Sequence, residues 1–429
     1  METEKLMQER TLTLEEIQRE NFTILIPTML PTHFKLMEGI LRSYGYRVEL
    51  LENSDESVVE YGLKYVHNDT CYPALLVIGQ MLSAIESGKY DKHRLALMIT
   101  QTGGGCRASN YIRLLRKALK KAGYGYIPVL SLNVSGLEKE SSFRLSPELG
   151  VRVLFAALCG DLLMLLRNQV KPYELSPGET ERLESRWVEI LAQALGKEAR
   201  FRYKTIKNFY RQIVRDFEAV PVQGGRKVRV GIVGEIFVKF SPLGNNELEK
   251  FLAHENAEVV MPGLMDFCMY CAHSSLTDTR LFGMKKTKGL IFGLALSLLE
   301  KMQKDLIRVI KENSRFDPPT EFAHVEKLAE TVISPGAKMG EGWLLTGEMI
   351  ELIEQGVNNI VCVQPFGCLP NHIVGKGMMK PLKEIYPEAN IVAVDYDAGA
   401  TRINQENRIK LMLANASGGP GSEKEAVNV

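Results

Sequence analysis

Short apolar segments alternate with amphipathic ones along the first third of the chain. The apolar segments have strand length, and the segments between them repeat buried positions every three to four residues, as helices do. The pattern predicts helices that end near Tyr44, Glu86 and Lys121, and strands at Phe22–Ile26, Arg47–Leu50, Leu95–Thr100 and Ile127–Leu132. Strands separated by single helices are typical of a parallel sheet covered by helices on both faces.

The same alternation returns in the second half, after a charged segment with helical spacing. The segment Glu181–Leu195 places Trp187, Ile190 and Leu191 on one helix face, which is typical of an amphipathic helix. A long helix is predicted from about Leu290 to Lys311, and strands are predicted at Val228–Val233, Glu258–Met261, Asn359–Gln364 and Asn390–Asp395. We therefore expect an α/β protein with two Rossmann-like or flavodoxin-like lobes, parallel sheets and a helical connecting region.

These patterns divide the 429 residues into five segments. The predicted segments are an N-terminal extension (1–20), a first α/β lobe (21–150), a helical connection or lid (151–225), a second α/β lobe (226–415) and a tail (416–429). Domains usually span about 100–200 residues, so a chain of this length suits two or three of them. The tail is rich in glycine, serine and charge, and we expect it to be disordered.

Composition and charge narrow the class of protein. Hydrophobic residues make up 45% of the chain and charged residues 24%, as is ordinary for a soluble globular protein. The net charge of +1 predicts no basic surface for nucleic acid or an anionic membrane. We expect no apolar run of about 18 residues and hence no membrane span. Residues 1–20 are charged and lack an apolar signal core, which predicts a cytoplasmic protein.

Seven cysteines carry most of the candidate chemistry. A chain that is not exported normally keeps its thiols reduced, so a disulfide framework is not expected. Three interpretations then remain for each cysteine: an inert core residue, a catalytic thiol or a metal ligand.

Three cysteines, Cys71, Cys106 and Cys368, share one local design, because each lies in a turn just before a predicted helix. Backbone N–H groups at a helix N-terminus favour the thiolate, which is the form that binds metal. Cys362 lies within a predicted strand. In open α/β sheets ligands bind beyond the carboxyl ends of the strands, so we expect these four cysteines to converge in a cleft between the lobes.

The spacing of the cysteines excludes two common metal-binding motifs in which the ligands are close in sequence. It matches neither the paired knuckles of a zinc ribbon nor the clustered run of a ferredoxin. Dispersed ligands suit an iron–sulfur cluster held between folded elements. Cys159 lies inside the apolar run Val151–Leu166 and is predicted to be a core residue. For Cys268-x-x-Cys271 three interpretations stay open: a pair of metal ligands, a redox-active dithiol, or a spacing that arose by chance.

Each of the other candidate residues has a functional and a structural interpretation. Gly103–Gly105 suits a phosphate cradle or a close backbone approach to a cluster, and the adjacent Cys106 favours the second. His372 is either a proton donor or a helix cap. Glu348 is expected to face solvent or cap a helix. Gly231-x-x-Gly234 lacks the third glycine of a dinucleotide fingerprint and is interpreted as a structural turn.

Long motifs around these residues resemble the 2-hydroxyacyl-CoA dehydratase family, and most closely its branch of double-cubane cluster proteins. The resemblance extends from about Thr23 to Leu413. It is carried by the segments Asn68–Ala74, Gln101–Tyr111, Gly340–Glu348, Gln364–His372 and Asp395–Asp397, with Asn404-Gln405 and Asn407-Arg408.

The resemblance implies a two-lobed α/β protein that carries an [8Fe-9S] double cubane, or alternatively one [4Fe-4S] cluster. The implied cluster ligands are Cys71, Cys106, Cys268, Cys271, Cys362 and Cys368. The sixth ligand is either Cys268 or Cys159, and Cys268 is preferred because it lies beside Cys271. Gly104, Gly105 and Gly367 are implied to lie against the cluster, and His372, Arg107 and Glu348 are candidate proton donors.

The resemblance also implies the partners and the reaction. A separate ATPase activase with its own iron–sulfur cluster would deliver low-potential electrons to this chain under anaerobic conditions, and the chain would reduce a small molecule. A homodimer is expected. Two alternatives remain: a 2-hydroxyacyl-CoA dehydratase component that eliminates water through a radical, and a two-lobed binding or scaffold protein with structural cysteines.

Overall fold

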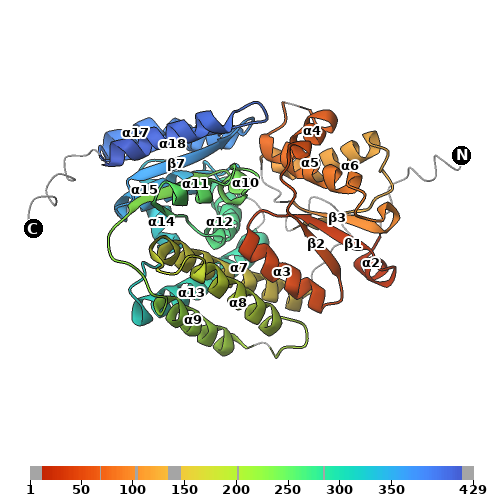
Figure 1. Ribbon diagram of the computed structural model, residues 1–429, viewed down its shortest axis with the longest axis horizontal. Coiled ribbons are helices and arrows are strands. Elements are labelled where there is room, and N and C mark those ends of the chain that lie inside the picture. Colours follow the sequence, from red (N-terminus) through yellow and green to blue (C-terminus); the bar gives the residue numbers. More distant parts are fainter. Residues whose placement is uncertain are drawn as a thin grey trace, which may run out of the picture. The chain divides into compact units, whose positions relative to one another are not determined.

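The computed structural model describes residues 12–67, 69–101, 105–133, 146–200, 202–283 and 286–417. The chain folds into two compact units, and each contains one sheet (Figure 1). Unit 1 comprises residues 1–160, 186–202 and 365–368, and unit 2 comprises residues 161–185, 203–364 and 369–429. The segment predicted as a helical connection therefore contributes to both units.

The sheet of unit 1 has the strand order β2-β1-β3-β4, and its neighbouring strands are parallel. Its strands are β1 (Thr23–Pro27), β2 (Arg47–Leu51), β3 (Leu95–Gln101) and β4 (Val129–Asn133). The helices of this unit include α2 (Leu14–Arg19), α3 (Pro31–Ser43), α4 (Glu56–Tyr65), α5 (Tyr72–Glu86) and α6 (Tyr111–Lys121). Figure 1 shows α3 on one face of the sheet, with α5 and α6 on the other.

Helix α4 is absent from the predicted elements, and its packing explains why it forms. Gly79 of α5 lies so close to α4 that an added Cβ would be 2.0 Å from the carbonyl oxygen of Val58. Gly62 of α4 approaches Leu75 in the same way, at 2.6 Å. Helix α4 is thus held by close contact with α5, which a local hydrophobic pattern does not reveal.

The sheet of unit 2 repeats the topology of the first, with the order β6-β5-β7-β8. Its strands are β5 (Val228–Gly234), β6 (Ala257–Val260), β7 (Asn359–Pro365) and β8 (Asn390–Tyr396). In each sheet the strand order reverses beside the first strand, which creates a flavodoxin-like switch point between β1 and β3 and between β5 and β7. The predicted α/β class with two parallel sheets is confirmed.

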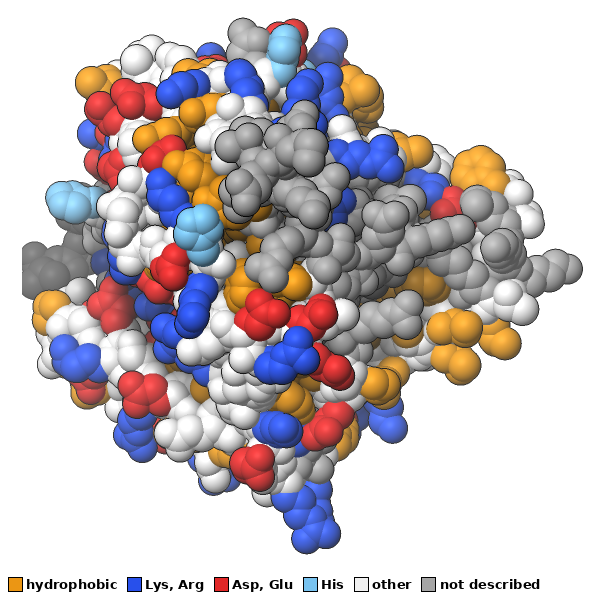
Figure 2. All heavy atoms as spheres, turned by 90° about the vertical axis from the view of Figure 1, so that its right-hand side faces the viewer, with side chains coloured by type: hydrophobic (Ala, Val, Ile, Leu, Met, Phe, Trp, Pro, Cys, Tyr) orange, Lys and Arg blue, Asp and Glu red, His pale blue; other side chains and the backbone are white. Residues whose placement is uncertain are grey.

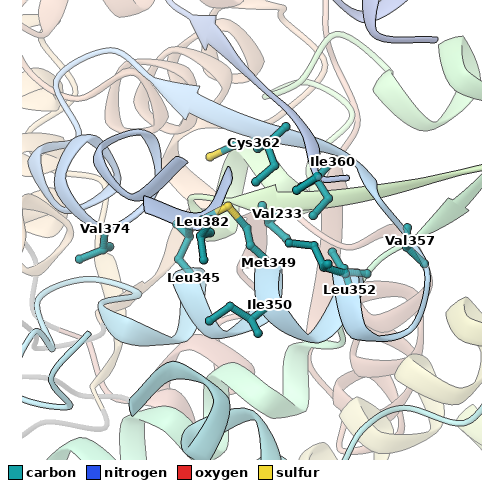
Figure 3. Close-up of a cluster of buried hydrophobic side chains, with 13 residues drawn as sticks. Val233, Leu345, Met349, Ile350, Leu352, Val357, Ile360, Cys362, Val374 and Leu382 are labelled. Carbon is teal, nitrogen blue, oxygen red and sulfur yellow. The ribbon is translucent and has the colours of Figure 1, made fainter. Parts of the chain in front are cut away.

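Ten helices of the described chain lie mainly or wholly in unit 2. They are α9 (Tyr203–Glu218), α10 (Ile236–Phe240), α11 (Leu248–His254), α12 (Leu264–Phe282), α13 (Lys286–Asn313), α14 (Phe322–Glu330), α15 (Trp343–Glu354), α16 (Leu369–Val374), α17 (Met379–Ile385) and α18 (Arg402–Ser417). Helix α15 is buried along its length, and its side chains pack against β5 and β7 in the core of the unit (Figure 3).

Two helices, α7 (Pro147–Val170) and α8 (Glu179–Ala194), are divided between the units. The stretch Pro147–Tyr173 is long and apolar enough to cross a membrane by composition, so the expectation that the chain has no such run is wrong. However, 67% of its most apolar window is buried inside the fold. Such burial is typical of a core helix in a soluble protein, and the apolar composition follows from that burial.

Figure 2 shows one face of the molecule, on which described lysine and arginine side chains lie among aspartate and glutamate side chains. The mixture agrees with the net charge of +1. No single sign of charge dominates this face, as expected for a protein without an electrostatic footprint for a polyanion.

Candidate functional site

The turn that contains Cys71 packs directly on the turn that contains Cys368. Cys71 is the N-cap of α5, and the next residue, Tyr72, donates its backbone N–H to the carbonyl oxygen of Phe366 at 3.0 Å. Gly367 has φ +74°, and a Cβ added to it would lie 3.0 Å from the Cα of Cys71. Only glycine combines this left-handed conformation with so close an approach. The two motif cysteines therefore lie in adjoining turns of unit 1.

The turn of Cys106 joins the same group through two contacts. Arg107 donates a hydrogen bond from its guanidinium to the carbonyl oxygen of Asp69, two residues before Cys71. The hydroxyl of Tyr111, the first residue of α6, lies 2.7 Å from Sγ of Cys71. Unit 1 thus brings together the turns that carry Cys71, Cys106 and Cys368, which are widely separated in sequence. We call these residues the three-turn site.

The chemistry of the three-turn site fits an iron–sulfur cluster. Cys71 and Cys106 precede helical turns, yet neither uses its side chain to cap them. Sulfur at a helix N-terminus lies in positive potential, which favours the thiolate that ligates iron. Cys71 is buried, whereas Cys106 and Cys368 are partly exposed. Three glycines were predicted to lie against the cluster. Gly367 contacts Cys71, which gives its predicted role a geometric basis. Gly105 is exposed in a bend, and Gly104 lies outside the described residues.

Cys362 occupies a different environment, in the hydrophobic core of unit 2. It lies on β7 opposite Val233 of β5 and is fully buried. Figure 3 shows it beside Ile360, above the side chains of α15. Burial raises the pKa of its thiol to about 12. Its Sγ lies 3.8 Å from Oδ1 of Asn371.

Cys268 and Cys271 lie on α12, one turn apart. Asp161 fixes the start of this helix by accepting hydrogen bonds at 2.8 Å from the backbone N–H groups of Leu264 and Met265. Burial, followed by negative charge on Cys271, raises the pKa of Cys268 to about 12. Cys271 is exposed. Both residues belong to unit 2, as Cys362 does.

Cys159 is fully buried within α7, and burial alone raises the pKa of its thiol to about 12. An apolar position of this kind is what the sequence pattern predicts for a core cysteine. Among the residues that the structure describes, no three His, Cys, Asp or Glu side chains are placed to hold a single metal ion. Cluster ligands differ from such a group because each thiolate binds a separate iron.

Two candidate proton donors are exposed. Arg107 is engaged with Asp69, and His372 on α16 contacts the side-chain nitrogen of Gln364 through its Nδ1. His372 lies in the last turn of helix α16 (Leu369–Val374), where a basic side chain can interact with the last carbonyl groups of the helix. Its contact with Gln364 occurs at the carboxyl end of β7, where the switch point of the second sheet lies.

The third candidate, Glu348, is placed differently from expectation. It is buried, and both of its carboxylate oxygens accept hydrogen bonds from Lys239 Nζ, at 2.9 and 3.0 Å. The expectation that Glu348 faces solvent or caps a helix is therefore wrong. The physical reason is that α15, which carries it, is buried on every side, so a charged residue there needs a buried partner.

Two further carboxylates, Glu235 and Glu341, are also buried. Glu235, just after β5, accepts a hydrogen bond from the N–H of Val238 at 2.9 Å, and Glu341 accepts one from the N–H of Ile236 at 3.0 Å. Both carboxylates thus cap the short helix α10. Burial, followed by the charge of Glu341, raises the pKa of Glu235 to about 8, and burial also raises the pKa of Glu341.

These residues leave a recognisable signal in the sequence. Glu235 and Lys239 are the only charged residues in the otherwise apolar run from Val230 to Phe240. They follow a strand that ends in a glycine, Gly234. Gly234 has φ +145°, and a Cβ added to it would lie 2.3 Å from the carbonyl oxygen of Val363, so the position has no room for a side chain. Gly234 therefore serves the close approach of β5 and β7, and a Cβ on Gly231 would lie 2.6 Å from the side chain of Leu352 on α15. Both glycines belong to strand β5, so the interpretation of Gly231-x-x-Gly234 as a turn is wrong, and they instead allow close packing of the strand.

The raised pKa of Glu235 predicts a loss of stability at alkaline pH. The ordinary value is 4.5 and the folded value is about 8, so the favourable effect of the protonated carboxyl is complete below pH 4.5 and is lost as pH rises through 8. We expect Glu235→Gln to stabilise the protein more at pH 9 than at pH 6, by on the order of 3 kcal/mol, because only part of the favourable effect has been lost at pH 6. Glutamine keeps an oxygen for the N–H of Val238.

Urea unfolding of both proteins at pH 6 and pH 9 measures this difference. Glu354→Gln on α15 is the matched control, because this carboxylate is exposed and its replacement should leave the pH dependence of the wild type unchanged. Equal pH dependence in the wild type and Glu235→Gln would show that Glu235 is ionised in the folded protein throughout this range.

Comparison of the chain with protein-family models gives no match, and comparison with curated proteins gives none either.

Proposed function

We propose that this protein is a cytoplasmic iron–sulfur oxidoreductase that receives low-potential electrons from a separate ATP-dependent activase and reduces a small molecule. The observation that carries the proposal is the three-turn site. It joins three turns that carry cysteines from family-like motifs, and two of these cysteines precede helical turns without capping them. An [8Fe-9S] double cubane held by Cys71, Cys106, Cys268, Cys271, Cys362 and Cys368 is the proposed cofactor.

The cluster would supply one-electron transfer at low potential, and the chain's own residues would control its surroundings. The thiolates of the three-turn site would hold iron. The Tyr111 hydroxyl, at 2.7 Å from Cys71 Sγ, would donate a hydrogen bond to this sulfur and withdraw charge from it. Arg107 would hold the turn before Cys71 in place through Asp69.

Proton supply is best assigned to groups that reach solvent. His372 and Arg107 are both exposed, and a histidine side chain can exchange protons near neutral pH. Arg107 stays charged, so its role is to bind an anionic group and not to give up a proton. Glu348 is engaged in the buried pair with Lys239, which makes it a poor proton donor. His372 is therefore our first candidate.

Anaerobic purification followed by iron and acid-labile sulfide counting tests the proposal. We expect about eight irons per chain if the double cubane is present and about four for a single cubane. Electron paramagnetic resonance of the dithionite-reduced protein should then show the cluster signal. A chain expressed with full iron–sulfur assembly that contains neither iron nor sulfide would contradict the proposal and favour structural cysteines.

The same preparation separates the reductase from the dehydratase. An activase with ATP should reduce the cluster in both cases. Turnover of a 2-hydroxyacyl-CoA to the unsaturated thioester, with water released, would identify the dehydratase. Consumption of reducing equivalents by a small molecule, without such an elimination, would support the reductase.

A further inference from the structure

Helix α15 carries a line of polar side chains although the helix is buried. Glu348, Glu351 and Gln355 follow one another at intervals of three and four residues, and Glu341 lies just before the helix. Residues at these intervals share one helix face, with Cβ atoms about 5–6 Å apart. The apolar side chains of α15 pack against the sheet instead (Figure 3). We call Glu341, Glu348, Glu351 and Gln355 the polar stripe.

The polar stripe and its surroundings contain more buried acid than base. Glu341, Glu348 and Glu351 are buried, and so is Glu235 at the end of β5. Among the residues that the structure describes, one ion pair reaches these four carboxylates, and it joins Glu348 to Lys239. An ionised carboxylate without a partner is costly in a protein interior. The carboxyls that lack a cation are therefore expected to hold protons near neutral pH.

The carboxyls influence one another in a continuous order. Burial raises the pKa of Glu351 to about 7 and also raises the pKa of Glu341, and the charge of Glu348 adds to both effects. Burial, followed by the charge of Glu341, acts on Glu235 in the same way. A carboxyl with a pKa near 7 can both take up and release a proton at neutral pH.

One end of the polar stripe reaches the surface at Thr320. Gln355 donates hydrogen bonds through Nε2 to the Thr320 hydroxyl at 2.7 Å and to Oε1 of Glu351 at 3.3 Å. Thr320 is partly exposed and lines a hollow of ≈ 570 Å³. The other oxygen of Glu351, Oε2, is buried and makes no hydrogen bond to the described residues. Asp266 of α12 also faces this end, where it accepts a hydrogen bond from Gln303 at 2.9 Å.

The other end of the polar stripe lies at a small cavity beside the carboxyl end of β5. The cavity has a volume of ≈ 10 Å³, and its lining includes Gly234, Lys239, Glu341 and Glu348. This volume is just enough for one water molecule, which needs about two to four polar partners in a protein interior. A water held by Lys239, Glu341 and Glu348 would connect the two carboxyls.

The strand ends beside this cavity also position His372. Glu235 follows Gly234 and donates its backbone N–H to the carbonyl oxygen of Val363 on β7, at 3.4 Å. The next residue of β7, Gln364, contacts His372. Ligands of open α/β sheets bind beyond the carboxyl ends of the strands, at the switch point. The polar stripe therefore leads to the edge of the sheet where His372 lies.

We propose that the polar stripe conducts protons from the surface at Thr320 to the carboxyl ends of β5 and β7. In each passage a proton moves from Glu351 to the carboxylate of Glu348 and on through a water to Glu341, which releases one at the strand ends. Glu351 then takes a new proton from solvent. Glu348 acts as a relay within its pair with Lys239 and not as a donor to a bound molecule. The use of these protons in a reduction rests on the proposed function, whereas the conduction itself does not.

Infrared spectroscopy of the folded full-length protein tests the proposal, because a protonated carboxyl has a separate C=O band that shifts on deuteration. At pH 6 we expect buried carboxylic-acid bands, of which Glu351→Gln and Glu341→Gln each remove one. After transfer into D2O, the Glu341 band should shift at least about tenfold more slowly in Glu351→Gln than in the wild type, since exchange then requires local opening of the fold. Thr320→Val should slow the shift of the Glu351 band in the same way.

Glu354→Gln is the matched control, because Glu354 lies on the same helix and is exposed. It should change neither the buried bands nor their exchange, and Glu341→Gln should leave the exchange of Glu351 at the wild-type rate. Absence of buried carboxylic-acid bands would overturn the proposal, and so would an equal or faster shift of the Glu341 band in Glu351→Gln. The measurement needs neither iron nor substrate, so a chain without iron would contradict the proposed function and leave this result intact.

Discussion

Replacement of Cys71 by alanine is expected to remove most of the iron and acid-labile sulfide from the anaerobically purified protein. Cys71 is the buried member of the three-turn site and contacts both Gly367 and Tyr111. Alanine offers no ligand in place of the thiolate. It also leaves the start of α5 intact, because the Cys71 side chain makes no capping hydrogen bond. The measurement is iron and sulfide per chain, with the resonance signal of the reduced cluster.

Cys159→Ala is the matched control for this experiment. Cys159 is also buried in unit 1, but it lies within a helix and its surroundings are apolar. Its replacement should leave iron and sulfide unchanged and lower the free energy of unfolding by about 1–2 kcal/mol through loss of buried volume. If Cys71→Ala kept its iron while Cys159→Ala lost it, the three-turn site would not be the site of the cluster.

Replacement of Lys239 by methionine is expected to be the most destabilising single change in unit 2. Lys239 and Glu348 are both buried and are joined by two hydrogen bonds. Loss of the cation leaves a buried carboxylate without its counter-charge, beside Glu341 and Glu351, which are also buried. Such a change lowers the free energy of unfolding by about 3–5 kcal/mol.

Urea unfolding followed by Trp343 fluorescence measures this loss. Trp343 lies in unit 2, so Trp187→Phe is used as the background to remove the tryptophan of unit 1. The double variant Lys239→Met with Glu348→Leu should recover most of the stability, because neither charge is then buried alone. Lys380→Met breaks an exposed pair with Glu384 and should change the free energy by less than about 0.5 kcal/mol. A loss below 1 kcal/mol in Lys239→Met would contradict the role of this pair.

The eight predicted strands agree with the structure to within two residues at each end, and α6 ends at the predicted Lys121. They could be predicted because each strand is an apolar segment with glycine, proline or polar residues at its ends, and this pattern is local in the sequence. Helix α4 could not be predicted in this way. It depends on Gly62 and Gly79, whose significance is visible only when α4 and α5 are packed together.

For the candidate site, too, some features could be predicted from the sequence and others could not. The amino-acid sequence by itself determined the fold class, and it pointed to Cys71, Cys106 and Cys368 as cysteines of one kind, since the turn before a helix is a local feature. Only the tertiary structure showed that Gly367 and Tyr111 bring these turns together, that Cys362 lies in a hydrophobic core, and that Glu348 is paired with Lys239. Burial and pairing depend on which distant segments meet, and a local pattern along one chain contains no record of that.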